Sequence, residues 1–389
     1  MSYIAGMSES IYLDNNATTP MLPEVADAIH EASLRYGANP ASQHRAGQEA
    51  RRALENARER IAELLGGKTS GMDADRLIFT SGGTEANNLA LLGVLGGLSP
   101  GHLITSAIEH PAVLGPIEQL ERQGWRVTRI GADGNGVVLV DQLRDAICAE
   151  THLVSVMAAN NETGVLQPID EIAELCASHA VALHTDAAQL VGKLPVNFSE
   201  RRLTALSCAA HKFHGPVGIG LLLVRHDVQI TPQLWGGHQQ AGLRPGTETV
   251  ALAMGMQVAL EVWHDAANAR LERMQKFQTR FEEQIVAEIP SATTIGRLAP
   301  RLPSTSTVAF SEVDRQAFFL ALDHAGVACS TGSACASGSS EPSPALMAMG
   351  LQKVLVESAL RFSWGATTKA EEIDEACRRI IKVHNHLRR

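Results

Sequence analysis

The chain lacks the features typical of nucleic-acid-binding, secreted and membrane proteins. It has 33 Lys and Arg against 42 Asp and Glu, a net charge of −9, and no basic run that would bind nucleic acid or anionic lipid. No window approaches the roughly 18 uninterrupted apolar residues of a membrane span. The first residues, MSYIAGMSES, have neither a basic segment nor a long apolar one, and Met7 would itself be an ordinary start. We therefore expect a cytoplasmic protein that binds neither nucleic acid nor membrane.

Cysteine is sparse, and its spacing is not that of a metal site or a disulfide framework. No CxxC pair occurs, and the density is below that of a secreted disulfide scaffold. The six cysteines are Cys148, Cys176, Cys208, Cys329, Cys335 and Cys377. We expect no metal and no structural disulfide, so any cysteine with a chemical role acts as a free thiol.

The chain does contain a regular alternation of buried strands and amphipathic helices. Apolar runs of strand length occur at RLIFTS, HLITSA, WRVTRI, HLVSVMAA, VALHTDAA, LTALSCAA and GIGLLLV. Helical stretches such as EANNLALLGVLGG, LVDQLRDAICAE and PIDEIAELCASHA lie between several of them, and the last has Pro168 in its expected first turn. This alternation predicts an α/β fold with a mainly parallel, seven-stranded sheet covered by helices.

A second, smaller domain is expected towards the C-terminus. A chain of 389 residues is long enough for two or three domains. From Thr249 to about Pro290 the pattern becomes long and helical, and shorter strand-like runs such as STVAF follow. We expect residues 17–262 to form a large domain, and residues 1–16 together with 263–389 to form a small α+β domain.

Residues that could bind a ligand or take part in catalysis follow three of the predicted strands. SGGTEANN, residues 81–88, combines a sharp turn with a helix start whose N–H groups are unpaired, which is typical of a phosphate site but is weak on its own. Asp186 follows VALHT, and Lys212 follows LTALSCAA between two histidines. Pyridoxal phosphate needs an amine for its aldehyde, a carboxylate for its ring nitrogen and donors for its phosphate. The three motifs together therefore suggest a pyridoxal phosphate enzyme.

Ten short motifs, in one order over nearly the whole chain, resemble those of cysteine desulfurases of the nitrogen-fixation and iron-sulfur-assembly type. They are YLDNNATTP, GANPASQHRAG, FTSGGTEANN, EHPAV, NNETGVLQPI, HTDAAQ, AAHKFHGPVGIG, GGHQQAGLRPGT, STGSACASGSSEPS and LRFSWG. The resemblance implies the pyridoxal phosphate fold type I, a homodimer, and conversion of L-cysteine to L-alanine with the sulfur left as a persulfide. It also implies an acceptor protein for that sulfur, either an iron-sulfur scaffold or a thiolation protein.

The resemblance further implies roles around the cofactor ring. Lys212 would be the Schiff-base lysine, and Asp186 would be the partner of the ring nitrogen. His110 would stack on the ring, although a histidine that merely caps a strand end is the simpler interpretation of EHPAV alone. Gln189 would touch the ring oxygen, and Asn161 would lie near that oxygen and the substrate carboxylate.

Other matched positions would bind the phosphate and the substrate. Gly83 and Thr84 would hold the phosphate, with His211 nearby, and Thr247 would reach the phosphate of the other subunit. Arg361 would bind the substrate carboxylate, because a guanidinium offers a rigid fork for that group. A surface arginine is the alternative, but the apolar run ALRFSW around it argues against this.

Cys335 would be the catalytic thiol that takes the sulfur. It lies in a run of Gly, Ser, Ala and Thr, about residues 328–343, which offers little to pack against and suits a mobile arm. A buried cysteine in a tight turn is the structural alternative. Cys329 ends the apolar run HAGVAC, and we expect it to belong to the core.

Departures from the family pattern leave rival hypotheses. Ala209 replaces a serine that many members have, which removes one expected phosphate donor, and Val217 stands where GPKG would have lysine. One rival is a related pyridoxal phosphate enzyme, an aminotransferase, racemase or selenocysteine lyase. Transamination and racemisation would leave Cys335 without a role. The other is a scaffold for sulfur carriers with a weakened site, against which the intact Lys212, Asp186, His110, Cys335 and Arg361 argue.

Overall fold

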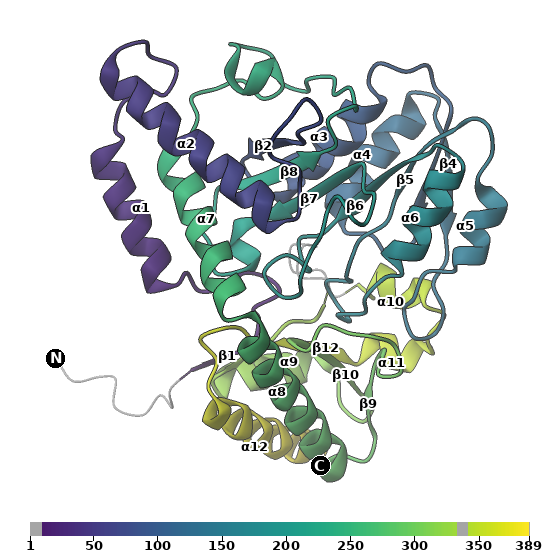
Figure 1. Cartoon of the computed structure of the whole chain (residues 1–389). Coiled ribbons are helices and arrows are strands. Elements are labelled where there is room, and N and C mark those ends of the chain that lie inside the picture. Colours follow the sequence, from purple (N-terminus) through teal and green to yellow (C-terminus); the bar gives the residue numbers. More distant parts are fainter. Residues whose placement is uncertain (1–9, 333–340, 389) are drawn as a thin grey trace.

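The computed structural model describes residues 10–332 and 341–388, and Figure 1 shows their arrangement. A seven-stranded sheet in the order β2-β8-β7-β6-β5-β3-β4 forms the centre of the larger part. Its strands are β2 (Arg76–Thr80), β3 (His102–Ser106), β4 (Arg126–Ile130), β5 (Thr151–Ser155), β6 (Ala182–Asp186), β7 (Ala205–Ala209) and β8 (Gly220–Val224). Strand β8 alone is antiparallel to its neighbours β7 and β2, so the predicted mainly parallel sheet is confirmed.

Helices cover both faces of this sheet (Figure 1). They are α1 (Pro23–Arg35), α2 (Arg45–Leu64), α3 (Gly83–Leu95), α4 (Pro111–Arg122), α5 (Val140–Ala146), α6 (Ile169–Ser178) and α7 (Val250–Asp265). Leucines of α3 and α4 pack on β3 and β5, whereas α2, α6 and α7 contribute to the large apolar cluster on the other face. Pro168 is the residue before α6 rather than part of its first turn, because the helix begins at Ile169. Short 3-10 turns occur at η1 (Ala210–Lys212) and η2 (Gln239–Gly242).

A smaller antiparallel sheet forms a second core. Strand β10 (Thr305–Phe310) lies between β9 (Ala292–Thr294) and β12 (Ala359–Ser363). The helices here are α8 (Ala267–Glu288), α9 (Arg315–His324), α10 (Pro344–Ala348), α11 (Lys353–Glu357) and α12 (Ala370–Leu387). Aromatic residues are only 4% of the chain, yet several gather in this core: Phe277, Phe281, Phe310, Phe318, Phe362 and Trp364.

The chain passes between the two parts at Ala266, which ends α7 and precedes α8. Helix α7 packs on α1 and α2, whereas α8 packs on α12 and the small sheet. The N-terminal strand β1 (Ile11–Tyr12) pairs in parallel with β11 (Val327–Ala328), which ties it to the small part. The division at residues 16/17 and 262/263 stays a proposal, and these contacts support it. Across residues 10–332 and 341–388, no helix has the length and apolar character to cross a membrane.

Candidate active site

The sheet brings the predicted site residues to one edge. Because β2 and β7 are both antiparallel to β8, β2 runs in the same direction as the parallel strands, and their carboxyl ends share an edge. A cavity of about 390 Å³ lies there. The predicted residues that line it are Gly83, Thr84, His110, Asn161, Asp186, Gln189, His211, Lys212 and Arg361. Nine residues from motifs spread over the chain therefore meet in one place.

The Lys212 amine lies at the end of η1, directly after β7. Its Nζ donates to the carbonyl oxygens of Asn16 over 2.8 Å and Ala17 over 2.9 Å. Both carbonyls belong to the YLDNNATTP motif, so this segment positions the lysine. The next residues turn back through His214, whose φ is 68°, and Gly215, where any Cβ would lie 2.8 Å from the Ala210 carbonyl oxygen.

Asp186 ends β6 and is buried at one wall of the cavity. Its Oδ2 accepts from Asn87 Nδ2 over 2.7 Å, and its Oδ1 accepts from the Ala188 N–H over 2.9 Å. Ser207 in turn donates to Asn87 Oδ1, which fixes the direction of that amide. The carboxylate is therefore held in one orientation by donors from α3 and from its own turn.

The predicted phosphate cradle is the N-terminus of α3. Gly82 is the N-cap residue of this helix and makes no side-chain capping bond. A Cβ at Gly82 would meet open space. A Cβ at Gly83 would lie 3.4 Å from Ala209 Cβ, so Ala209 faces the same space. His211 also lines it, and burial, with Lys212 as a second cause, lowers the pKa of His211 to about 4. A neutral imidazole and free helix N–H groups are suitable donors for a phosphate.

His110 caps α4 rather than a strand. Its Nδ1 accepts from the Ala112 N–H over 3.0 Å, and the residue lines the cavity. Because Nδ1 accepts that bond, the proton of the neutral ring is on Nε2. His110 is therefore a helix cap at the wall of the cavity, the strand-end interpretation is wrong, and its stacking on a cofactor ring stays a prediction.

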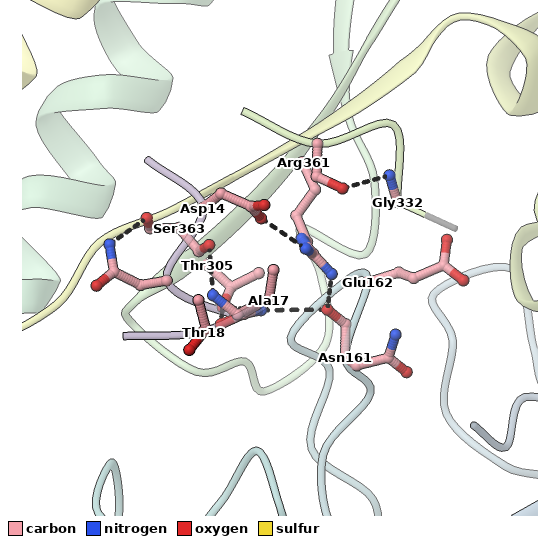
Figure 2. A network of polar contacts seen from close by, with 12 residues as sticks. Asp14, Ala17, Thr18, Asn161, Glu162, Thr305, Gly332, Arg361 and Ser363 are labelled. Carbon is pink, nitrogen blue, oxygen red and sulfur yellow. Dashed lines mark hydrogen bonds and ion pairs between the residues drawn. The ribbon is translucent and has the colours of Figure 1, made fainter. Parts of the chain in front are cut away.

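Arg361 lies in β12 of the small sheet and is 2% exposed. Figure 2 shows its guanidinium between Asp14 and Asn161. Nη2 donates to Asp14 Oδ1 over 2.7 Å and Nη1 donates to the Asn161 carbonyl over 2.9 Å. The surface-arginine alternative is wrong, because the guanidinium lines the cavity.

Several contacting residues are ones that sequence reasoning missed. Asn16 is 1% exposed; its carbonyl accepts from Lys212 and Gln189, and its Nδ2 donates to the Asn161 carbonyl over 3.1 Å. Lys193 donates to Gln189 Oε1 over 2.5 Å. The motif YLDNNATTP and the scarcity of lysine are the sequence signals that point to these two residues.

Two buried acids near the cavity were also missed. Burial raises the pKa of Glu109 to about 8, although hydrogen bonds from Ser106 and the Met157 N–H act to lower this pKa. Burial also raises the pKa of Glu162, whose Oε2 has no hydrogen-bond partner among the described residues. A side chain at Gly332 would come within 2.7 Å of that oxygen, so glycine is required there.

Two predicted residues do not line this cavity. Thr247 is exposed on the segment before α7, and its predicted contact is with another subunit. Cys335 lies outside the described residues. Cys329 is 7% exposed and belongs to the aromatic-rich core, as expected, and burial raises the pKa of its thiol to about 12.

The amine, the carboxylate and the helix N-terminus meet the needs of pyridoxal phosphate, and the fold with this cavity defines a pyridoxal-phosphate-dependent enzyme of fold type I. The chain belongs to the aminotransferase class-V family, whose family model matches residues 11–376.

Curated relatives within this family are cysteine desulfurases. The chain is 40% identical to one from Trichormus azollae, over 96% of this chain and 91% of the relative. It is also 40% identical to one from Klebsiella pneumoniae, over 98% and 94% of the two chains. A protein named cysteine desulfurase IscS, from Dictyoglomus turgidum, is 40% identical over 95% and 93%.

Two solved structures superimpose on this chain over most of its length. A NifS-like protein from Rickettsia africae superimposes with a TM-score of 0.88 at 29% identity, over 97% of this chain and all of the other. SspA in complex with cysteine gives a TM-score of 0.80 at 33% identity, over 91% and 98% of the two chains.

Proposed function

We propose that this site converts L-cysteine to L-alanine and transfers the sulfur to Cys335 as a persulfide. The observation that carries the proposal is that the Lys212 amine, the Asp186 carboxylate and the Arg361 guanidinium line one cavity of about 390 Å³. The relatives support this reaction, because they are named cysteine desulfurases and one similar structure was solved with cysteine. The enzyme is a pyridoxal-phosphate-dependent cysteine desulfurase by this comparison.

The residues around the cavity would hold the cofactor. When bound, pyridoxal phosphate supplies an aldehyde that takes up amines and a ring that stores electrons from the substrate's alpha carbon. Asp186 would hold the ring nitrogen in its protonated form, and His110 would lie against the ring. Gln189 and Asn161 would lie near the ring oxygen.

The phosphate would lie at the N-terminus of α3. Gly83 and Thr84 offer backbone N–H groups there, and His211 adds a neutral imidazole. Thr247 would complete the phosphate site of a second subunit, which requires a homodimer. The exposed position of Thr247 supports this arrangement.

The chain's own residues then divide the chemistry. Arg361 binds the carboxylate of L-cysteine, and Asp14 holds the guanidinium in place. Lys212 accepts the alpha proton at Nζ and later returns a proton to the carbon fragment. The Cys335 thiolate receives the substrate sulfur, so L-cysteine and one thiol become L-alanine and one persulfide.

The persulfide would pass to an acceptor protein, either an iron-sulfur scaffold or a thiolation protein. The name IscS of one relative favours an acceptor that assembles iron-sulfur clusters. The cysteines among the described residues are all free thiols, which fits a reducing compartment such as the cytoplasm.

Incubation of the holoenzyme with L-cysteine and a reductant tests the proposal. Sulfide and alanine are measured together, and we expect equal amounts of both. Pyruvate in place of alanine, or racemisation of cysteine without sulfide, would contradict the assignment. A protein that retains the cofactor but forms no alanine would favour the scaffold hypothesis.

A further inference from the structure

Lys193 is a second lysine beside the reactive amine, and nothing in the proposed reaction uses it. It follows Gly192 in the turn after β6, four residues beyond Gln189. A Cβ at Gly192 would lie 2.2 Å from Phe213 Cβ, so only glycine lets this turn pack against the segment that carries Lys212. The packing places both lysines along the wall of one small cavity of about 40 Å³.

The amine of Lys193 has amide oxygens, not carboxylates, as its partners. Nζ donates to Gln189 Oε1 over 2.5 Å and to Asn16 Oδ1 over 2.9 Å. Among the described residues, none of the ion pairs includes Lys193. Burial holds the pKa of Lys193 well below its ordinary value, with the nearby charges of Lys212 and Arg361 as further causes. A buried lysine without an acid lowers the stability of the fold. Such residues are often found at functional sites, which suggests that Lys193 has a role in this one.

The direction of these bonds determines how both amides point. Lys193 Nζ donates to both side-chain amides, so each amide turns its oxygen towards the lysine. The NH₂ group of Gln189 then faces away, and it donates to the Asn16 carbonyl over 3.0 Å. The NH₂ group of Asn16 donates to the Asn161 carbonyl and to Thr305 Oγ1. A neutral amine has two N–H groups and a charged one has three, so both protonation states keep this arrangement.

We propose that Lys193 is a positioning residue of the active site: it fixes Gln189 with its amide oxygen turned away and its NH₂ group directed to donate on the cavity side. The inference rests on the proposed function, in which Gln189 lies near the ring oxygen of the cofactor. An amide with its oxygen towards that ring oxygen would repel it, whereas the NH₂ group attracts it. Lys193 thereby acts on the cofactor through Gln189 without touching it.

The experiment is a double-mutant cycle on the holoenzyme. Lys193→Met, Gln189→Ala and the double variant are compared with the parent for the rate at which pyridoxal phosphate leaves, followed by visible absorbance. We expect about tenfold faster release in each single variant, and about tenfold rather than hundredfold in the double variant. Both single variants should also shift the absorbance maximum of the bound cofactor in the same direction. Lys353→Met is the matched control, because that side chain is 85% exposed.

The outcomes separate this inference from the proposed function. Faster release in Gln189→Ala with none in Lys193→Met overturns the inference and leaves the proposed function standing. No change in either variant removes Gln189 from the cofactor contacts and overturns the inference, whereas the proposed reaction is tested separately by the sulfide and alanine assay. Additive effects in the double variant show that Lys193 acts by another route, which also overturns the inference. If Lys193→Met does not fold, Lys193→Leu, which also lacks a donor for Gln189, replaces it in the same cycle, with the same outcomes.

Discussion

The Asp14 carboxylate holds Arg361 at the edge of the active-site cavity, with Nη2 of the guanidinium 2.7 Å from Oδ1 of the acid. The arginine side chain is 3% exposed and the aspartate side chain 19%, so water screens the pair little. Asp14 comes from the segment after β1 and Arg361 from β12, and Figure 2 shows both segments side by side. The pair therefore fixes the group proposed to bind substrate.

Replacement of Asp14 tests this arrangement. Asp14→Ala leaves a buried guanidinium without its acid and held, among the described residues, only at Nη1 by the Asn161 carbonyl, so we expect KM for L-cysteine to rise about tenfold or more. Asp14→Asn keeps an oxygen at the same place and should show a smaller rise. Steady-state kinetics on cofactor-loaded protein gives both values. An unchanged KM in Asp14→Ala would mean that Arg361 does not need this partner to bind the substrate.

Loss of the proposed reactive amine should abolish turnover. Lys212→Ala removes the group that binds the cofactor and moves the alpha proton, and a general base alone contributes about 10²- to 10⁴-fold. We expect this variant to lose both the visible absorbance of the bound cofactor and the production of alanine. Borohydride treatment followed by mass spectrometry locates the modified lysine in the parent protein. Lys353→Ala should keep both signals, and a borohydride adduct on any lysine other than Lys212 would contradict the assignment.

Local signals in the sequence predicted the sheet, the phosphate cradle, Asp186 and Lys212, whereas His110, Asn161 and Arg361 were assigned through the resemblance to the family. Short apolar runs specify buried strands, and side chains just after parallel strands meet at one edge. The reversed direction of β8 was not predictable in this way, because its run GLLLV is buried on both faces and carries no mark of direction. Asn16 and Lys193 were missed because their contacts join segments separated by 177 positions. Such contacts leave no periodic pattern in the sequence.

A serine at position 209 should tighten cofactor binding. Ala209 lines the cavity beside the N-terminus of α3, where the phosphate is proposed to lie. A hydroxyl there adds one hydrogen bond to a charged group, worth about 1.5 to 3 kcal/mol, or roughly tenfold to hundredfold slower cofactor loss. Dialysis of Ala209→Ser and the parent, followed by absorbance, measures the difference. Ala205→Ser, at the other end of the same strand, should leave retention unchanged. Equal loss from Ala209→Ser and the parent would show that the phosphate already has all its donors.

The buried carboxyl of Glu109 should make stability depend on pH. Its pKa is about 8 in the folded protein and 4.5 ordinarily, so the folded state retains a proton that the unfolded state loses. This contribution is fully present below about pH 4.5 and is lost as the pH rises through about 8. Glu109→Gln keeps an oxygen for Ser106 and the Met157 N–H. We expect the free energy of unfolding of this variant, relative to the parent, to rise by about 4 kcal/mol between pH 5 and 8.5.

Urea titrations of Glu109→Gln and the parent give that difference at each pH. Glu283→Gln, at an exposed position, is the control, and a constant difference for Glu109→Gln would contradict the buried assignment.

The sulfur-accepting thiol can be identified by comparing two cysteines six positions apart. Cys335→Ala should bind the cofactor and L-cysteine, because Lys212, Asp186 and Arg361 are unchanged, but should stop before sulfur release, since cleavage of the carbon-sulfur bond needs a thiolate to receive the sulfur. Cys329→Ala should keep full activity and lose only stability, because Cys329 is buried in the aromatic-rich core and burial raises its pKa to about 12. Each variant is mixed with L-cysteine, alanine is measured, and protein persulfide is trapped by alkylation before mass spectrometry. Persulfide on Cys329, or normal alanine production by Cys335→Ala, would show that Cys335 is not the sulfur-accepting thiol.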